Sequence, residues 1–309
     1  MGIRRLRVST WIAKKVLEFG QHTPLHGRGG YGQRAAKSSA EVSSFREART
    51  EAARVSDFFR FFGGRGVQDA LFEKDVLDFG SGYGGRTVEY ARAFCARFVW
   101  GVEPFTNVVA ESNRYAESEA VANVRFLVCG HTSVPLADES IDVIVSYDVL
   151  EHVADPRLSI QEMYRVLRPG GSAYLVFPVY FGAFSHHLDY ISLFPGLHWV
   201  FSPVTLVQAV NSILATAGSD KFGTGQQPRP AVSFDGARLV LPTLNGLGGE
   251  HLGGLFRDFS SVRIARHGWI SRRQPQSAAM KMLSTSRAPN RLLDALTSSV
   301  SCVLTKGDT

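Results

Sequence analysis

A glycine-rich turn at residues 80–85 is the first place in this chain where residue types and spacing point to chemistry. Gly80, Gly82 and Gly85 follow the order G-x-G-x-x-G directly behind the apolar run "VLDF". Glycines at this spacing allow a tight turn and a close approach of a ligand to the backbone. Glu103 ends the next apolar run, where a carboxylate would accept hydrogen bonds from both ribose hydroxyls of an adenosine. The pattern predicts an adenosine-containing cofactor, either a nicotinamide dinucleotide or S-adenosylmethionine.

Asp78 separates these two cofactors, because it stands two residues before the first glycine. A pyrophosphate arriving at the turn would be repelled by the Asp78 carboxylate. A ligand that carries an ammonium and a sulfonium would be attracted by it. The charge at Asp78 therefore favours S-adenosylmethionine over a dinucleotide.

Four blocks in register extend the pattern, and they read "VLDFGSGYG", "VWGVEP", "VPLADESIDVIVSYDVLEHV" and "YRVLRPGGSAYLVFP". Together they span about residues 75–178. In these blocks the sequence resembles class I S-adenosylmethionine-dependent methyltransferases, specifically the methyltransferase type 11 group. The resemblance implies a transferase of class EC 2.1.1.- with S-adenosyl-L-methionine as cofactor.

The resemblance also implies roles for single residues. Asp78, Gly80 and Gly82 would line the methionyl and ribose part of the cofactor, and Glu103 would bind the ribose hydroxyls. Ser146 to Asp148 would face the sulfonium and the acceptor. The residues expected to bind the cofactor are Asp78, Gly80, Ser81, Gly82, Tyr83, Glu103, Pro104, Gly130, His131, Ser146 and Tyr147.

One position departs from the family pattern. The family often has an aspartate after the third strand, and this chain has Cys129-Gly130-His131 there. The adenine contact would then be made by backbone alone, or His131 would replace the aspartate. His131 as a plain exposed loop histidine is the structural alternative.

Structural alternatives stand beside the other roles as well. Asp78 could cap the amides of the turn, and Glu103 could be an acid at a helix start. His152 could hold its loop by hydrogen bonding instead of acting as a base. Tyr83 could be a surface residue or an aromatic cover on the cofactor.

Candidate catalytic residues follow the fourth and fifth apolar runs. Methyl transfer from a sulfonium is an in-line displacement, so the protein mainly aligns the partners and excludes water. An oxygen or nitrogen acceptor gains from a nearby base. The candidates are Asp148, His152, His186 and His187. The cluster of His186, His187, Asp189 and His198 matches no strong metal motif, and we expect no resident metal.

The elements that position these residues alternate between strands and helices. Apolar runs predict strands at 75–80, 97–104, 124–130, 140–150 and 172–178. Amphipathic spacing predicts helices at 85–96, 106–120 and 155–171, the last ending at a glycine pair. Repeated βα units imply an α/β, Rossmann-like, doubly wound parallel sheet with helices on both faces.

The rest of the chain is expected to complete this domain. Residues 1–70 are predicted to form an N-terminal helical extension or lid, and residues 71–309 the methyltransferase domain. Within that domain we expect a core at 75–178, an acceptor-side insertion at about 179–257 and C-terminal strands at about 258–309. The family architecture implies seven strands, mostly parallel, with the last strand inserted antiparallel near the edge.

Composition narrows the setting. The hydrophobic fraction of 44% and the charged fraction of 20% are those of an ordinary folded protein. Three cysteines fit reduced thiols, and the first residues lack a secretory h-region. We therefore expect a cytoplasmic protein. Five basic residues lie among the first fifteen, interleaved with apolar ones, so this segment could contact the inner face of a membrane peripherally.

The acceptor is the least determined partner. We expect a small molecule or a glycan, methylated on oxygen or nitrogen. A methyltransferase acting on RNA or protein and a non-catalytic cofactor-binding protein remain alternatives. Nucleic acid is not expected, because the core blocks are not basic and no appended RNA-binding motif is present.

Overall fold

A computed structural model describes seven stretches of the chain, residues 2–21, 40–63, 65–130, 133–188, 191–217, 228–268 and 290–308. The chain forms two compact units. The larger, here called the sheet unit, comprises Ser38–Pro178, Glu250–Arg287 and Ser299–Thr309. The smaller, here called the α9 unit, comprises Met1–Lys37, Val179–Gly249 and Ala288–Ser298. The predicted boundary at residue 70 stays a prediction.

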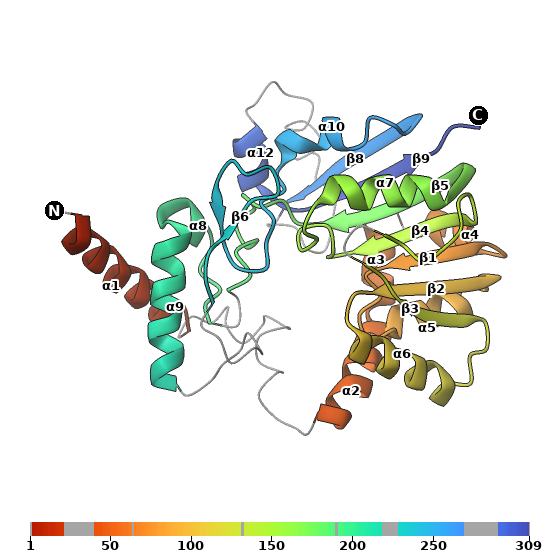
Figure 1. Ribbon diagram of the computed structural model, residues 1–309, viewed down its shortest axis with the longest axis horizontal. Helices are drawn as coiled ribbons and strands as arrows, with labels where there is room; N and C mark the ends of the chain where they lie inside the picture. Colours follow the sequence, from red (N-terminus) through yellow and green to blue (C-terminus); the bar gives the residue numbers. More distant parts are fainter. Residues whose placement is uncertain are drawn as a thin grey trace. The chain divides into compact units, whose positions relative to one another are not determined.

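A seven-stranded sheet forms the centre of the sheet unit, in the order β3-β2-β1-β4-β5-β9-β8 (Figure 1). The strands are β1 (Asp75–Phe79), β2 (Phe98–Glu103), β3 (Val124–Val128), β4 (Ile141–Tyr147), β5 (Leu167–Phe177), β8 (Ser261–Gly268) and β9 (Thr297–Thr305). The first five pair in parallel, and β9 pairs antiparallel to β5. The predicted doubly wound sheet with its antiparallel last strand is therefore confirmed.

Both faces of this sheet are covered. Val76 and Val143 pack with Phe58 of α3 on one face, and all three are buried. Side chains alternate along a strand, so Leu77 and Ile144 point to the opposite face, and both are fully buried as well. Burial on both faces is the reason why these strands are continuous apolar runs.

The helices of the sheet unit connect these strands. They are α2 (Ala40–Ala53), α3 (Val55–Arg60), α4 (Arg65–Leu71), α5 (Gly85–Arg92), α6 (Thr106–Ser118), α7 (Pro156–Val166) and α10 (Leu252–Leu255), with a 3-10 turn at Gly249–His251. The predicted end of α7 at the glycine pair is wrong. Leu167 already has extended backbone angles, and Arg168 precedes Pro169, a position that disfavours the helical conformation. The strand β5 therefore starts directly at the end of the helix.

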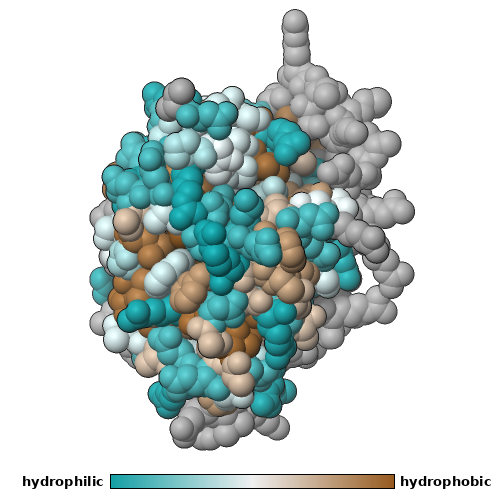
Figure 2. Space-filling view, turned by 90° about the vertical axis from the view of Figure 1, so that its right-hand side faces the viewer, coloured by the Kyte–Doolittle hydropathy of each residue, from teal (hydrophilic) through white to brown (hydrophobic). Residues whose placement is uncertain are grey.

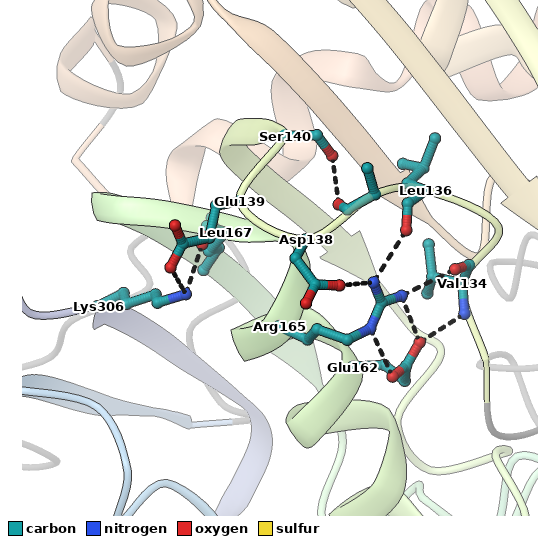
Figure 3. Close-up of polar contacts among 10 residues, drawn as sticks. Val134, Leu136, Asp138, Glu139, Ser140, Glu162, Arg165, Leu167 and Lys306 are labelled. Carbon is teal, nitrogen blue, oxygen red and sulfur yellow. Dashed lines mark hydrogen bonds and ion pairs between the residues drawn. The ribbon is translucent and has the colours of Figure 1, made fainter.

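Arg165, near the end of α7, holds the loop that leads into β4 (Figure 3). Its guanidinium donates to both carboxylate oxygens of Glu162 at 2.9 and 2.8 Å. It also donates to the carbonyl oxygens of Leu136 and Val134, each at 2.9 Å, and pairs with Asp138 at 2.6 Å. Because arginine presents its donors in a fixed fork, one side chain fixes the course of residues 134–138.

The α9 unit contains α1 (Gly2–Gln21), α8 (Leu197–Val200), α9 (Pro203–Ala217), α12 (Asn290–Ala295) and an antiparallel pair of β6 (Ala231–Val232) and β7 (Leu239–Val240). The Ser202 hydroxyl caps the start of α9, because it accepts from the Thr205 amide at 3.2 Å, and Pro203 is the first residue of the helix. Ala13 and Leu17 of α1 are fully buried in one core with Leu206 and Val210 of α9. Thr10 and Lys14 add hydrogen bonds to α9.

Surface polarity is mixed on the face that Figure 2 shows, where brown hydrophobic patches alternate with teal hydrophilic residues. Apolar atoms normally make up about half of a folded protein's surface, so scattered patches of this kind are ordinary. Among the described residues, no helix combines the length and the apolar character that a membrane crossing requires.

Candidate cofactor site

The glycine turn between β1 and α5 has a backbone that side chains would strain. Gly80, Gly82 and Gly84 adopt φ angles of +81°, +55° and +86°. These values lie in the left-handed region, which costs residues other than glycine about 1 kcal/mol or more. The turn also folds back on the sheet, because the amides of Gly80 and Ser81 both donate to the Val102 carbonyl of β2.

The space around the glycines is filled largely by other parts of the chain. A Cβ built on Gly80 would lie 2.3 Å from the Val149 side chain that follows β4. A Cβ built on Gly85 would lie 1.7 Å from the carbonyl oxygen of Ala48 in α2. The glycines at these two positions are therefore explained by packing within the protein, without any ligand. This close approach to α2 was not foreseen from the G-x-G-x-x-G spacing.

Glu51 of α2 binds the turn directly. Its Oε1 accepts from the Tyr83 amide at 3.2 Å, and its Oε2 accepts from the Gly85 amide at 3.0 Å. Burial raises the pKa of Glu51 to about 7, although Arg86 and these two amides oppose the shift. A carboxylate from the chain itself thus occupies the amide donors at the start of α5.

Glu103 lies at the end of β2, across the turn from Glu51. Its Oε2 accepts from the Gly82 amide at 3.3 Å. Burial raises the pKa of Glu103 to about 7, and the nearby charge of Asp78 adds to the shift. The structure therefore brings the predicted ribose-binding carboxylate to the predicted turn.

Asp78 is buried beneath the turn, with 4% of its surface exposed. Its Oδ2 accepts a hydrogen bond of 2.6 Å from the Thr87 hydroxyl. Burial raises the pKa of Asp78, and the Thr87 hydroxyl and Arg86 oppose that rise. The bond to Thr87 ties β1 to α5, and within the described residues Asp78 accepts no hydrogen bond from the turn amides.

Two serines that were predicted to bind the cofactor have different surroundings. Ser81 is buried, and within the described stretches its hydroxyl has no hydrogen-bond partner. Ser146 is buried as well, but its hydroxyl donates to the Phe79 carbonyl at 2.9 Å and so joins β4 to β1. Of these two serines, Ser81 is the one whose hydroxyl a ligand could satisfy with a hydrogen bond.

Tyr147 lies on the face of the sheet that α3 covers. Its ring meets Phe58 of α3 edge to face, with centroids 5.9 Å apart. The Arg86 guanidinium lies 5.0 Å from the centre of the same ring. Arg86 also opposes the raised pKa values of Glu51 and Asp78, so it is the main positive charge beside the acidic turn.

The residues predicted to flank the adenine lie at the ends of β2 and β3. Pro104 is exposed directly after Glu103. Gly130 is exposed and its amide donates to the Ser133 carbonyl at 3.1 Å, which closes a small loop. His131 lies outside the described residues. Phe105, which we did not predict, is 60% exposed beside Pro104 and offers an aromatic face at the same strand end.

Asp148 stands at the end of β4 in a strained backbone conformation. Its φ of +57° is left-handed, and its amide donates to the Val176 carbonyl of β5 at 2.8 Å. Asp148 is exposed as a residue, yet desolvation of its carboxyl by the surrounding protein raises its pKa to about 6, against the opposing charges of Arg86 and Arg54. Strained residues of this kind concentrate at functional sites.

Glu151 and His152 follow one turn later. Glu151 is 4% exposed, and within the described stretches neither of its carboxylate oxygens accepts a hydrogen bond. Burial, with the charge of Asp148 adding to it, raises the pKa of Glu151 well above its usual range. His152 is exposed, and its Nε2 lies 3.7 Å from Glu151 Oε1. Asp148, Glu151 and His152 therefore form a compact titratable group.

His186 and His187 belong to the α9 unit. His186 is 1% exposed, its Nδ1 accepts from the Leu188 amide and its Nε2 donates to the Phe194 carbonyl, both at 3.0 Å. Burial, with His198 nearby, lowers the pKa of His186 to about 3, so its ring is neutral. His187 has a left-handed φ of +52°. Their catalytic role stays a prediction, as does that of Asp148 and His152.

Two acidic residues of this site, Glu51 and Glu151, were not predicted from the sequence. Glu51 gave no local signal, because it lies on an amphipathic helix far from the turn in sequence. Glu151 did give one, since an acid inside the apolar stretch "YDVLEHV" is unlike a solvated surface residue. Its burial without a hydrogen-bonded partner makes it a candidate for the site.

In open α/β sheets with such a turn, adenosine-containing ligands bind at the carboxyl ends of the strands. Residues 77–175 match the family model of the methyltransferase domain. An uncharacterized methyltransferase of Mycobacterium sp. (strain JLS) is 36% identical over 159 residues, which cover 51% of this chain and 53% of that protein. One from Mycolicibacterium vanbaalenii is 40% identical over 114 residues, which cover 36% and 42%. The chain spans about half the length of the curated relatives it matches.

Solved structures of similar fold include two methyltransferases. An S-adenosylmethionine-dependent methyltransferase of Methanosarcina mazei is 18% identical, with a TM-score of 0.45 over 78% of this chain and 96% of that one. Geranyl diphosphate methyltransferase in complex with S-adenosylmethionine is 15% identical, with a TM-score of 0.46 over 90% and 93%. Residues 77–175 are thus similar to the methyltransferase domain, and the curated relatives that this chain matches are methyltransferases.

Proposed function

We propose that this protein transfers a methyl group from S-adenosylmethionine to a small-molecule or glycan acceptor, on oxygen or nitrogen. The observation that carries the proposal is the arrangement of Glu103 at the end of β2, 3.3 Å from the Gly82 amide of a left-handed glycine turn. A carboxylate at this point suits a ribose diol. The curated relatives are methyltransferases, which supports the reaction type.

The residues around the turn fit this cofactor better than a dinucleotide. Glu51, Asp78 and Glu103 surround one turn, and burial, with the charge of Asp78 adding to it, raises the pKa of both glutamates. A site with three desolvated carboxyls favours a positively charged ligand with hydroxyl donors. The buried hydroxyl of Ser81 offers one more polar group for such a ligand.

When bound, S-adenosylmethionine supplies a methyl group on a sulfonium, a leaving group that is already activated. Glu103 holds the ribose, and Asp78 adds negative charge beneath the turn. The acceptor is aligned and shielded from water by the residues after β4. Asp148 and His152 are the proposed proton acceptors for an acceptor hydroxyl or amine. His186 and His187 are retained as predicted acceptor-side residues of the α9 unit.

A direct binding experiment tests this proposal. Isothermal titration with S-adenosylhomocysteine and with NAD compares the two cofactor classes on the same sample. We expect micromolar binding of the first and none of the second. Glu103→Ala is expected to weaken S-adenosylhomocysteine binding about tenfold or more, because charge-assisted hydrogen bonds to the ribose are lost. Glu117→Ala, an exposed glutamate of α6, is the matched control. NAD binding, or no binding by folded protein, would overturn the proposal.

The methyl acceptor decides between the remaining alternatives. An RNA- or protein-directed enzyme would transfer labelled methyl groups to total RNA or to a protein extract. A small-molecule or glycan enzyme would label a low-mass fraction instead. A protein that binds S-adenosylhomocysteine yet labels none of these fractions would support the non-catalytic alternative.

The outward face of α1 gives the chain a second contact surface, and we propose that it meets an anionic membrane surface. Trp11 is 61% exposed and Phe19 is 65% exposed, on the side of α1 opposite to the buried Ala13 and Leu17. Lys15 is exposed on the same outward side, and arginines stand at positions 4, 5 and 7. Exposed aromatic residues with lysine and arginine are typical of helices that lie in a membrane interface.

Vesicle sedimentation tests the contact through α1. We expect binding to vesicles with anionic lipids, weaker binding to neutral vesicles, and loss of binding in the double variant Trp11→Ser, Phe19→Ser. Phe72→Ser removes an aromatic ring of the sheet unit that is 54% exposed and serves as the control. Equal sedimentation of the double variant and the control variant would contradict the contact.

A further inference from the structure

Glu51 belongs to a helix that the methyltransferase domain match does not include, because the match starts at residue 77. Its carboxylate nevertheless accepts hydrogen bonds from two backbone amides of the glycine turn, those of Tyr83 at 3.2 Å and Gly85 at 3.0 Å. Those amides, at the start of α5, are the groups that hold a pyrophosphate in dinucleotide-binding folds. In this protein they are already taken by an acid of the chain.

The position of Glu51 is fixed by close packing. The backbone of α2 passes Gly85 so tightly that an added Cβ would lie 1.7 Å from the Ala48 carbonyl oxygen. A Cβ on Gly82 would lie 2.7 Å from Glu51 Oε1. Ser44, two turns earlier on α2, donates to Glu111 of α6 at 3.0 Å and anchors the helix at a further point. The carboxylate is thus held against the turn by the close approach of the α2 backbone to Gly85 and by the hydrogen bond between Ser44 and Glu111.

We propose that Glu51 is a specificity-determining residue, which fills the anion-binding amides of the turn and thereby excludes phosphate-bearing ligands from the cofactor site. This inference rests on the proposed function, because it explains how a G-x-G-x-x-G turn accepts an S-adenosyl ligand and rejects a dinucleotide. Exclusion has two parts. The amides of Tyr83 and Gly85 already donate to Glu51, so they cannot donate to a phosphate. The negative charge of Glu51 also repels a phosphate.

Titration of three ligands into four proteins tests the inference. The ligands are S-adenosylhomocysteine, ADP and inorganic pyrophosphate, and the proteins are the wild type, Glu51→Gln, Glu51→Ala and Glu47→Gln. Glu47 lies one turn earlier on α2, and its charge reaches Tyr83, so its substitution removes the same charge from the same helix. Thermal unfolding of each variant establishes that it is folded.

We expect the wild type and Glu47→Gln to bind S-adenosylhomocysteine and to reject ADP and pyrophosphate. Glu51→Ala frees both amides, so its affinity for ADP or pyrophosphate should rise about tenfold or more. Glu51→Gln keeps the shape but loses the charge, and its affinity should lie between those of the wild type and Glu51→Ala. If Glu51→Ala does not fold, Glu51→Gln alone decides.

The inference and the proposed function fail in different ways. Wild-type protein that does not bind S-adenosylhomocysteine would overturn the proposed function. Wild-type protein that binds it, together with Glu51 variants that gain no affinity for ADP or pyrophosphate, would overturn the inference alone. An equal gain in Glu47→Gln would also overturn it, because the effect would then come from general charge.

Discussion

Gly85 of α5 and Ala48 of α2 approach so closely that a methyl group on the glycine would lie 1.7 Å from the Ala48 carbonyl oxygen. The contact is with backbone, which cannot move aside as a flexible side chain could. It connects the helix before the methyltransferase match with the first helix inside it.

Replacing Gly85 with alanine should therefore displace α2. We expect Gly85→Ala to lower the free energy of unfolding by about 1–3 kcal/mol, the usual cost of overpacking. Gly66→Ala is the control, since a Cβ there meets no atom within 4 Å and alanine is the better helix residue. Urea unfolding followed by circular dichroism measures both. Equal stability of the two variants would contradict the close contact.

Cofactor binding should depend on pH through Glu103. Burial raises the pKa of Glu103 to about 7, so the ligand-free folded protein binds this proton more tightly than the unfolded chain does. The resulting stabilisation of the fold is complete below about pH 4.5 and is lost as the pH rises through about 7. Ribose hydroxyls need the ionised carboxylate as acceptor. We expect affinity for S-adenosylhomocysteine to fall about tenfold per pH unit below pH 7.

Isothermal titration between pH 5.5 and 8.5 measures this dependence. The change in affinity for S-adenosylhomocysteine per pH unit should be smaller in Glu103→Gln, which cannot ionise at this position. Some slope should remain in that variant, because Glu51 also has a pKa of about 7. A wild-type affinity that is constant across this range would contradict the assigned role of Glu103.

Arg165 should stabilise the loop before β4. Arg165→Met removes the bonds to Glu162 and to the carbonyls of Leu136 and Val134, and we expect a loss of about 1–3 kcal/mol in the free energy of unfolding. Arg60→Met is the control, because that side chain is 64% exposed and, among the described residues, pairs with Asp57 alone. Its loss should stay below about 0.5 kcal/mol. Chemical unfolding that shows equal losses would refute the difference between the two sites.

Thr87 should matter through its hydroxyl. Thr87→Val leaves the buried Asp78 without its 2.6 Å hydrogen bond, and we expect the free energy of unfolding to fall by about 1–3 kcal/mol at pH 7. Thr87→Ser keeps the hydroxyl and should lose less. Differential scanning calorimetry compares the two variants. A valine variant as stable as the serine variant would show that the bond contributes nothing.

The sheet and the turn were predictable from sequence because their signals are local. Continuous apolar runs mark strands that are buried on both faces, as Leu77 and Val76 are on opposite sides of β1. The left-handed angles of Gly80 and Gly82 explain why glycines are needed there. Glu103 follows from its place at the end of a strand beside the turn.

The remaining features depend on contacts between residues far apart in the chain. Glu51 reaches the turn from α2, and nothing in its neighbours marks it among the other acids of that helix. The engagement of Ser146 with Phe79, and of both His186 nitrogens with backbone groups, arises only once the chain is folded. The predicted end of α7 at the glycine pair was wrong, because Pro169 disfavours the helical conformation at Arg168 and the helix already ends at Val166.

The position of β9 in the sheet determines when the edge of β5 is covered during synthesis. β9 follows the other six strands of this sheet along the chain, but it lies between β5 and β8 and pairs with β5 from Ser172–Thr305 to Phe177–Val300. Until the ribosome has made residues 297–305, β5 presents an open edge, and such an edge invites pairing with other chains. The nascent protein therefore carries this open edge while residues 178–296 are made, and its sheet becomes continuous only when β9 has been synthesised.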